Sequence, residues 1–453
     1  MEKLKDRSAK GTSSFRYAIG MFGTSIPINM FKTYAAVYYV VSLGLSTKNY
    51  AMILLIYTFV DAIDNPVYGF LSDRTRSPWG RRRPWLVIGA PLLVLAFIMF
   101  YNPPAFSSES SMFIYVLLMY IMTGTLDSLI NANYGALFPE LFRDDVKRAK
   151  TNAMRQAFQL MAMIISIALT PVITGKIGYS KTAIIYGVLA VVVIWFCAFG
   201  CKENPQAMET VKPQLWSSLK ALLINPKFWI FGLTNAFYTA AMSLVLQAVP
   251  FFVLYTLKLD NSKTTVLLGS VLIVAIFSVI IWAGIVKRFK LMPAWRSALM
   301  IMSVGFIPLY FMKNLMGTAI MCCFIGFGIA GVMATTDLIG ARIMDEDTRK
   351  YGVCREGIYS SAMGFMNRLN GLFISLAFLL VNNLYGFESG DIPGQNPGGA
   401  ARFLLTIFPF IAMVLSCVFA FIMKFDDRDN NANDLDIKDT WKESKNGKEI
   451  FNQ

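Results

Sequence analysis

The sequence is dominated by long apolar runs that recur along its whole length, each separated from the next by a polar stretch. Each run is long enough for an α-helix to cross a hydrocarbon core of ~30 Å, which needs about 20 apolar residues. Charged residues make up only 15% of the 453-residue chain, against about 25% in soluble domains. We therefore expect one all-α polytopic membrane protein rather than several soluble domains.

The polar breaks between these runs predict twelve transmembrane helices in two six-helix halves. The longest break separates a half at 1–201 from a half at 228–424, with a cytosolic linker at 202–227 and a flexible polar tail at 425–453. Two such halves are typical of secondary transporters. The expected spans are 15–43, 48–71, 85–104, 111–138, 151–175, 180–201, 228–257, 264–286, 294–312, 316–341, 357–385 and 400–423.

The basic residues predict how the chain is oriented in the membrane. Of 42 basic residues, 33 lie at the N-terminus, in the loops after even-numbered spans or in the tail, seven lie in the opposite loops, and two lie within spans. Basic loops stay in the cytoplasm, so both termini of this multi-pass protein of the cell (inner) membrane are expected to be cytoplasmic. The net charge of +14 thus reflects topology, and nucleic-acid binding is not expected.

Several kinds of chemistry are missing from the sequence. Histidine is absent, and the six cysteines lie in or beside apolar runs without a zinc-like spacing, which argues against a metal centre and a disulfide framework. With no serine–base pair and no glycine-rich phosphate loop, we expect neither an enzyme nor an organic cofactor. A sensor is not expected either, because no signalling domain is appended.

Ionisable residues inside the apolar runs carry most of the functional information. Such a residue costs at least ~2.5–3.5 kcal/mol on insertion scales, so it usually faces a cavity and pairs. Structural ion pairs between helices could account for single residues. Four acids and two bases on five spans are more typical of a polar cavity with ion coupling. The six residues are Lys32, Asp61, Asp64, Asp127, Asp337 and Arg368.

The second span predicts a cation site. Asp61, Asp64 and Asn65 are spaced i, i+3 and i+4, so they share one helix face. Pro66 removes a backbone hydrogen bond and frees a carbonyl one turn back. Two carboxylates, an amide oxygen and a carbonyl suit a hard cation such as Na⁺. The same pair could instead bind a proton, because neighbouring carboxylates raise one another's pKa.

The fourth span adds a polar face that we expect near this site. Ser128 could supply a hydroxyl ligand to the acids of the second span. Asp127, Asn131 and Tyr134 share a face, and such side chains suit a hydroxyl-rich substrate, although Tyr134 could equally pack in the core. Lys32 and Arg368 add donors from the first and eleventh spans, where they bind substrate or neutralise Asp127 or Asp337.

The loop after the second span contains a recognisable pattern. It combines Gly-x-x-x-Asp-Arg with Gly-Arg-Arg and resembles the loop signature of the major facilitator superfamily. Asp73 could pair with arginines and cap a helix, which would latch one conformation of the two halves. The arginines could otherwise be orientation charges alone. The expected latch residues are Gly69, Asp73, Arg74, Gly80, Arg81 and Arg82.

A longer stretch resembles one family within that superfamily. The pattern Asp-Ala-Ile-Asp-Asn-Pro-x-x-Gly, followed by Gly-Arg-Arg-Arg-Pro-Trp, is similar to the glycoside–pentoside–hexuronide:cation symporters, the family of melibiose permease. Further matches occur at 131–140, at Arg155 and at 355–357, so the resemblance covers both halves. It implies a twelve-helix carrier that couples sugar uptake to Na⁺ or H⁺ flow.

The resemblance assigns a cation site to Asp61, Asp64, Asn65 and Ser128. Asp64 and Asn65 stand in the reverse of the family's usual order, which spaces the carboxylates i and i+3 instead of i and i+4. The number of acids is unchanged, and the resemblance does not decide between Na⁺ and H⁺.

For the sugar site, the resemblance implies several departures. Ser25 and Asn131 stand where melibiose permease has sugar-binding carboxylates, and Gly135 stands where it has a stacking tryptophan. Arg155 is similar to a family arginine close to the sugar pathway, and Arg368 to a family lysine. The loss of two acids makes the pocket less negative. Both a uronide-containing oligosaccharide and a neutral glycoside are therefore candidate substrates.

The sequence thus predicts a sugar:cation symporter that works by alternating access in the lipid bilayer. Nothing in the sequence requires more than a monomer. The expected substrate-binding residues are Ser25, Lys32, Asp127, Asn131, Tyr134, Arg155 and Arg368. A uniporter or an exporter on the same fold is the alternative.

Overall fold

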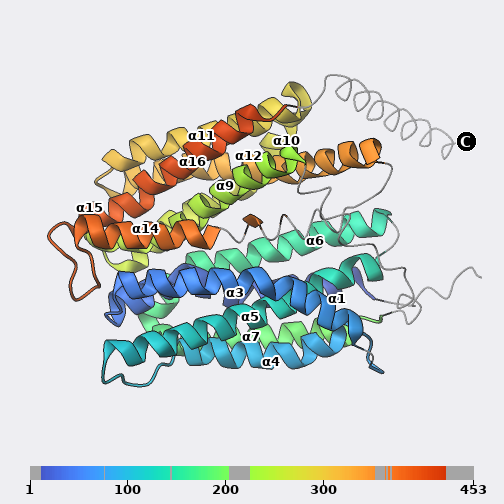
Figure 1. Ribbon diagram of the computed structural model, residues 1–453, viewed down its shortest axis with the longest axis horizontal. Helices are drawn as coiled ribbons and strands as arrows, with labels where there is room; N and C mark the ends of the chain where they lie inside the picture. The colour runs from blue at the N-terminus through green and yellow to red at the C-terminus, as the bar shows by residue number, and fades with distance from the viewer. Residues whose placement is uncertain are drawn as a thin grey trace, which may run out of the picture.

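The computed structural model shows a bundle of helices that run along its long axis (Figure 1). It describes residues 12–75, 77–142, 145–203, 225–351, 363, 366–367 and 370–424, without the side chains of some residues inside these ranges. The described residues form helices and their connections, with no strand among them. Helix α1 begins and α16 ends at the right-hand end of Figure 1, which we call the terminal end.

Nineteen helical segments follow one another along the described chain. Four of them are short π-helical turns that continue a neighbouring α-helix, and these turns are η1, η2, η4 and η6. The segments are α1 Ser14–Ala18, α2 Gly20–Ala36, η1 Val37–Ser42, α3 Thr47–Arg74, α4 Arg83–Phe100, α5 Glu109–Leu141, α6 Asp145–Met163, η2 Ile164–Leu169, α7 Thr170–Gly200, α9 Pro226–Phe251, η4 Phe252–Thr256, η5 Asn261–Lys263, α10 Thr264–Phe289, α11 Leu291–Phe311, α12 Leu315–Tyr351, α14 Asn370–Tyr385, α15 Pro397–Arg402, η6 Phe403–Ile407 and α16 Phe408–Ile422.

These segments account for the twelve expected spans. Within the described residues, eight stretches are long and apolar enough to cross a membrane, and the longest, Lys150–Gly200, turns at Gly178 (φ 81°) and so contains two spans. The first span is divided among α1, α2 and η1. The second, α3, is less apolar because it carries the acids. The described part of the eleventh ends in α14.

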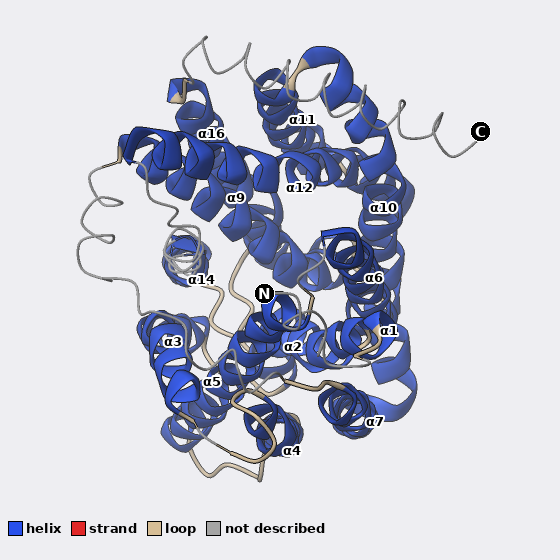
Figure 2. Cartoon of the chain, turned by 90° about the vertical axis from the view of Figure 1, so that its right-hand side faces the viewer, coloured by secondary structure: helices blue, strands red, loops and turns tan. Residues whose placement is uncertain are grey.

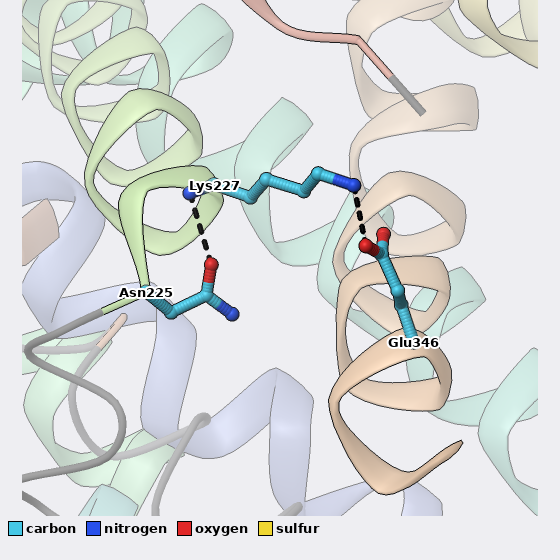
Figure 3. Close-up of polar contacts among 3 residues, drawn as sticks. All are labelled: Asn225, Lys227 and Glu346. Carbon is cyan, nitrogen blue, oxygen red and sulfur yellow. Dashed lines mark hydrogen bonds and ion pairs between the residues drawn. The ribbon is translucent and has the colours of Figure 1, made fainter. Parts of the chain in front are cut away.

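The helix starts follow local sequence rules. The Ser46 side chain accepts a hydrogen bond from the Asn49 N–H at the start of α3, and Ser108 forms a capping box with Ser111 at the start of α5. At α9, Asn225 accepts from the Lys227 N–H at 3.0 Å, just before the helix. Lys227 also forms an ion pair with Glu346 of α12 (Figure 3), so the first turn of α9 is tied to α12.

The two halves lie side by side, and three of their contacts are among the most extensive. In Figure 2, which looks along the bundle from the terminal end, α14 lies beside α3 at one edge and α10 lies near α6 at the other. Helix α3 contacts α14, η2 contacts α10, and α2 contacts α9. Helices of both halves therefore surround the long axis of the bundle.

At the end opposite the termini, the segment between α14 and α15 closes over the first half. The Thr47 N–H donates to the Glu388 carbonyl at 2.6 Å, and the Thr47 hydroxyl donates to the Phe387 carbonyl at 2.6 Å. The Gly390 N–H donates to the Val40 carbonyl at 2.8 Å. These three hydrogen bonds, which we call the outer clasp, join the two halves directly.

The structure adjusts some of the expected boundaries. Helix α12 runs on to Tyr351, ten residues beyond the expected end of the tenth span, because the polar residues after 341 continue the helix past the apolar run. The linker between the halves lies mostly outside the described residues, and the tail from 425 onward lies wholly outside them.

Candidate functional site

Two carboxylates of α3 face hydroxyl groups of α5. Asp61 Oδ1 accepts hydrogen bonds from the Ser128 hydroxyl at 3.0 Å and from the Tyr57 hydroxyl at 3.1 Å. Asp64 Oδ2 accepts one from the Thr125 hydroxyl at 2.9 Å. Asp64 is only 7% exposed. The structure therefore places Asp61, Asp64 and Ser128 in one oxygen-rich group between two spans, which we call the acid pair site.

The composition of this site fits a small cation. It offers carboxylate and hydroxyl oxygens and, among the side chains given above, no nitrogen ligand. Hard cations such as Na⁺ take ligands of this kind, and a carboxylate can take a proton instead. The side chain of Asn65, also expected here, lies outside the described part of the structure.

Two members of the acid pair site were not predicted from the sequence. Tyr57 stands four residues before Asp61, and Thr125 stands three residues before Ser128. Each therefore shares a helix face with a predicted ligand. A search for hydroxyl residues at these spacings would have found both.

A second polar group begins one residue along α5. Asp127 is 7% exposed, and its Oδ1 accepts a hydrogen bond from the Asn131 amide at 2.6 Å. Lys32 of α2 is exposed and interacts electrostatically with Asp127. Because Asp127 and Ser128 are consecutive residues, this group and the acid pair site share one turn of α5. A shift of that turn would move both.

The space beside this group is open. A side chain built at Gly135, one turn along α5 from Asn131, would meet no atom within 4 Å. Ser25 lies on α2 and is nearly buried at 6% exposure. It stands seven residues before Lys32, a spacing that puts both on one helix face. Ser25, Lys32, Asp127 and Asn131 thus lie on facing parts of two neighbouring spans of the first half.

Tyr134 and Arg155 occupy a different environment. Tyr134 is 3% exposed, its ring stacks on Tyr17 with centroids 4.6 Å apart, and its hydroxyl donates to the Tyr17 carbonyl at 2.9 Å. Arg155 lies over the Phe138 ring at 5.0 Å and interacts electrostatically with both tyrosines. Tyr134 therefore packs in the core, the second of the two roles that its position allowed.

Backbone N–H groups of the loop between α3 and α4 converge on one carboxylate. Glu203 accepts hydrogen bonds from the backbone N–H groups of Arg81 at 2.6 Å, Arg82 at 3.0 Å and Arg83 at 2.7 Å. Gly80 has φ 108° and turns the chain so that these groups converge. The N-terminus of α4 favours negative charge. Glu203 was missed by the sequence analysis, because its partners lie 120 residues earlier.

The remaining predicted site residues are only partly described by the structure. Arg82 also hydrogen-bonds the Ser72 hydroxyl. Asp337 of α12 is exposed and forms no ion pair within the described residues. Arg368 falls outside the described part of the chain, and of Gly69, Asp73 and Arg74 only the backbone is described.

Comparison with known proteins agrees with this architecture. Residues 16–427 match the family described as MFS/sugar transport protein. The chain belongs to this family. It is a multi-pass membrane transporter, not an enzyme, and its twelve spans form the major facilitator fold in two six-helix halves.

Individual relatives are distant but cover most of the chain. It is 25% identical to the isoprimeverose transporter of Lactiplantibacillus pentosus, over 82% of this chain and 81% of that protein. It is 24% identical to the inner membrane symporter YicJ of Escherichia coli (strain K12), over 89% of each. The crystal structure of the nucleoside transporter NupG superimposes with a TM-score of 0.69 at 10% identity, covering 91% of this chain and 99% of that one, which shows the fold alone.

Proposed function

We propose that this family member imports a sugar or glycoside together with Na⁺ or H⁺. The observation that carries the proposal is the acid pair site, where Asp61 and Asp64 accept hydroxyl hydrogen bonds inside two membrane spans. Ionisable groups inside membrane spans usually face a polar cavity and mark ion pathways, and the oxygen ligands gathered here are of the kind that hard cations take. The isoprimeverose transporter and the YicJ symporter, both similar over most of their length, support a sugar and a coupling ion.

Coupling follows from the adjacency of Asp127 and Ser128. A cation held by the acid pair site fixes the α5 turn that carries Ser128, and the same turn presents Asp127 and Asn131 to a sugar. Each ligand then raises the affinity for the other by the same factor, typically about 1–3 kcal/mol. Alternating access moves the two halves around this site.

The orientation follows from the distribution of charge. The excess of basic residues in the loops after even-numbered spans supports a cytoplasmic terminal end, and we propose that the clasped end lies outside and that the protein acts as a monomer in the cell membrane. From this orientation we infer that the conformation closed by the outer clasp faces the cytoplasm. In this conformation we expect the Arg81–Arg83 loop, with Asp73 and Arg74, to act as the conformational latch.

The test is transport by purified protein in vesicles. With an imposed Na⁺ or H⁺ gradient, the wild type should accumulate labelled sugar, whereas Asp61→Asn and Asp64→Asn should allow equilibration only. Asp260→Asn, an exposed acid in a loop, is the matched control and should accumulate sugar normally. Accumulation against a gradient by both site variants would refute the assignment.

A uniporter or an exporter on the same fold is the second candidate. The paired acids favour coupling, because facilitated diffusion needs no ion site. Wild-type uptake that is equal with and without either gradient would establish a uniporter, and gradient-driven release of preloaded sugar would establish an exporter.

A further inference from the structure

Three polar side chains on one face of α2 lack hydrogen bonds or ion pairs with the described residues, although Lys32 interacts electrostatically with Asp127. Ser25, Asn29 and Lys32 are spaced i, i+4 and i+7, so they share a helix face. Within the described structure, Ser25 and Lys32 form no hydrogen bond or ion pair, and Asn29 Nδ2 is enclosed without an acceptor. We call these three residues the α2 polar row.

The lack of hydrogen bonds in the α2 polar row contrasts with the other polar side chains of the first span. Elsewhere along the first span, Thr24, Tyr34 and Tyr39 donate hydrogen bonds to backbone carbonyls. Most buried polar groups in proteins are paired in this way, and an unpaired one calls for an explanation. A row of three unpaired groups in a membrane span is explained if a ligand supplies the partners in another step of the cycle.

Asn29 is the central member and was not singled out in the sequence. Its amide nitrogen is enclosed, while the side chain as a whole is half-buried and its oxygen forms no hydrogen bond. An amide offers both donors and an acceptor, the combination that matches two neighbouring sugar hydroxyls. Half a turn of the amide group exchanges the positions of its nitrogen and oxygen.

Lys32 gives the row a charged end. Asp127, the acid with which it interacts electrostatically, is buried and accepts a hydrogen bond from Asn131 at 2.6 Å. No acid of the described residues forms an ion pair with Lys32 within 4 Å. An exposed ammonium in a span therefore keeps its donors for an anion. The row extends seven residues, about 10 Å along the helix, which is longer than a single pyranose ring.

We propose that the α2 polar row binds the substrate directly, with Asn29 on sugar hydroxyls and Lys32 on the carboxylate of a sugar acid. This inference rests on the proposed function. It specifies the substrate as an acidic glycoside of two rings instead of a neutral glycoside. It adds Asn29 as a specificity-determining residue, and it assigns the discrimination between acidic and neutral sugars to Lys32.

The experiment measures equilibrium binding in detergent, without any ion gradient. The probes are para-nitrophenyl glucuronides and galacturonides in both anomeric forms. Each is paired with the neutral glycoside that differs only in bearing a hydroxymethyl group instead of the carboxylate. The variants are Lys32→Gln, Lys32→Arg and Asn29→Leu, with Asn383→Leu at an exposed position of α14 as the control.

The wild type should bind one acidic probe about tenfold or more tightly than its neutral partner, the ordinary strength of a charge-assisted hydrogen bond. Lys32→Gln should abolish this preference and leave neutral affinity unchanged, while Lys32→Arg should keep it. Asn29→Leu should weaken both probes about tenfold without lowering the melting temperature, because it removes an unpaired donor. Asn383→Leu should bind like the wild type.

Three results would overturn the proposal. They are a wild type that prefers no acidic probe, a Lys32→Gln variant that keeps the preference, and an Asn29→Leu variant that binds both probes normally. None of these affects ion-driven accumulation through Asp61 and Asp64, so the proposed symport stands or falls by its own test.

Discussion

Ser128 occupies the position where the two polar groups of the first half meet. Its hydroxyl donates to Asp61, and its chain neighbour Asp127 accepts from Asn131. A single α5 residue therefore touches the acid pair site while the residue before it faces the α2 polar row. Small changes at this position should report on coupling more directly than removal of an acid.

We expect Ser128→Ala to weaken cation binding about tenfold, since a hydrogen bond to a charged group contributes about 1.5–3 kcal/mol. The measurement is the concentration of Na⁺ or H⁺ that gives half-maximal sugar uptake. Ser270→Ala is the control, because the Ser270 hydroxyl bonds only a carbonyl of its own helix. An unchanged ion dependence in Ser128→Ala would exclude this hydroxyl as a ligand.

The charged residues of the acid pair site could be predicted from the sequence. Asp61 and Asp64 stand out because a carboxylate in an apolar run has few structural explanations. Asn29 and Tyr57 did not, since an amide or a phenol is common in membrane helices. The role of Glu203 could not be predicted without knowing that the end of α7 lies next to the α3–α4 loop. Charge was therefore predictable, whereas partners distant in sequence were not.

Two elements meet next to the acid pair site with almost no space between them. A side chain built at Gly371 of α14 would lie 2.1 Å from the Thr58 hydroxyl of α3. Thr58 stands three residues before Asp61, so this contact between the halves lies one turn from the proposed cation. The twelve spans were predictable from apolar runs, but this pairing of the second span with the eleventh was not.

Gly371→Ala should lower the transport rate several-fold by forcing α3 and α14 apart. Thr58→Ala in the same protein should restore it, because the clashing hydroxyl is gone. Neighbouring residues typically show coupling of about 0.5–3 kcal/mol in such a cycle. Turnover of the two single variants and the double variant is the measurement, and additive losses would show that the two positions act separately.

The turn before α4 gives a second prediction about an element. Gly80→Ala should lower the free energy of unfolding by about 1–3 kcal/mol, the usual cost of a residue in a disfavoured backbone region. Its new methyl group would also lie 2.6 Å from Glu203. Thermal unfolding in detergent measures this, with Gly284→Ala as the control because no atom lies within 4 Å there. Equal stability of the two variants would contradict the assigned turn.

The molecule as a whole is held shut at one end by the outer clasp. Its three hydrogen bonds run between Val40 or Thr47 of the first half and the 387–390 segment of the second. Opening toward that side must break all of them. The balance between the two orientations of the carrier therefore depends on this small contact as well as on the ligands.

Gly390→Val should shift the population toward the conformation open at the clasped end, because a side chain there would lie 2.1 Å from the Val41 carbonyl. Spin labels at Ser107 and Lys313, exposed at that end on different halves, should report longer distances. Gly175→Val, where no atom lies within 4 Å, should leave the distances unchanged. An unchanged distance distribution in Gly390→Val would show that the clasp does not control opening.

The chemistry of the outer clasp has a consequence for the divergence of related carriers. Two of its three hydrogen bonds join backbone groups alone, from Thr47 to Glu388 and from Gly390 to Val40. Backbone groups are present whatever side chain a position carries. Substitutions at the exposed Glu388 should therefore be tolerated. Gly390, the buried Val40 and Thr47, whose hydroxyl makes the third bond, should resist replacement. Other exposed loop residues at this end are therefore free to change without loss of these backbone hydrogen bonds.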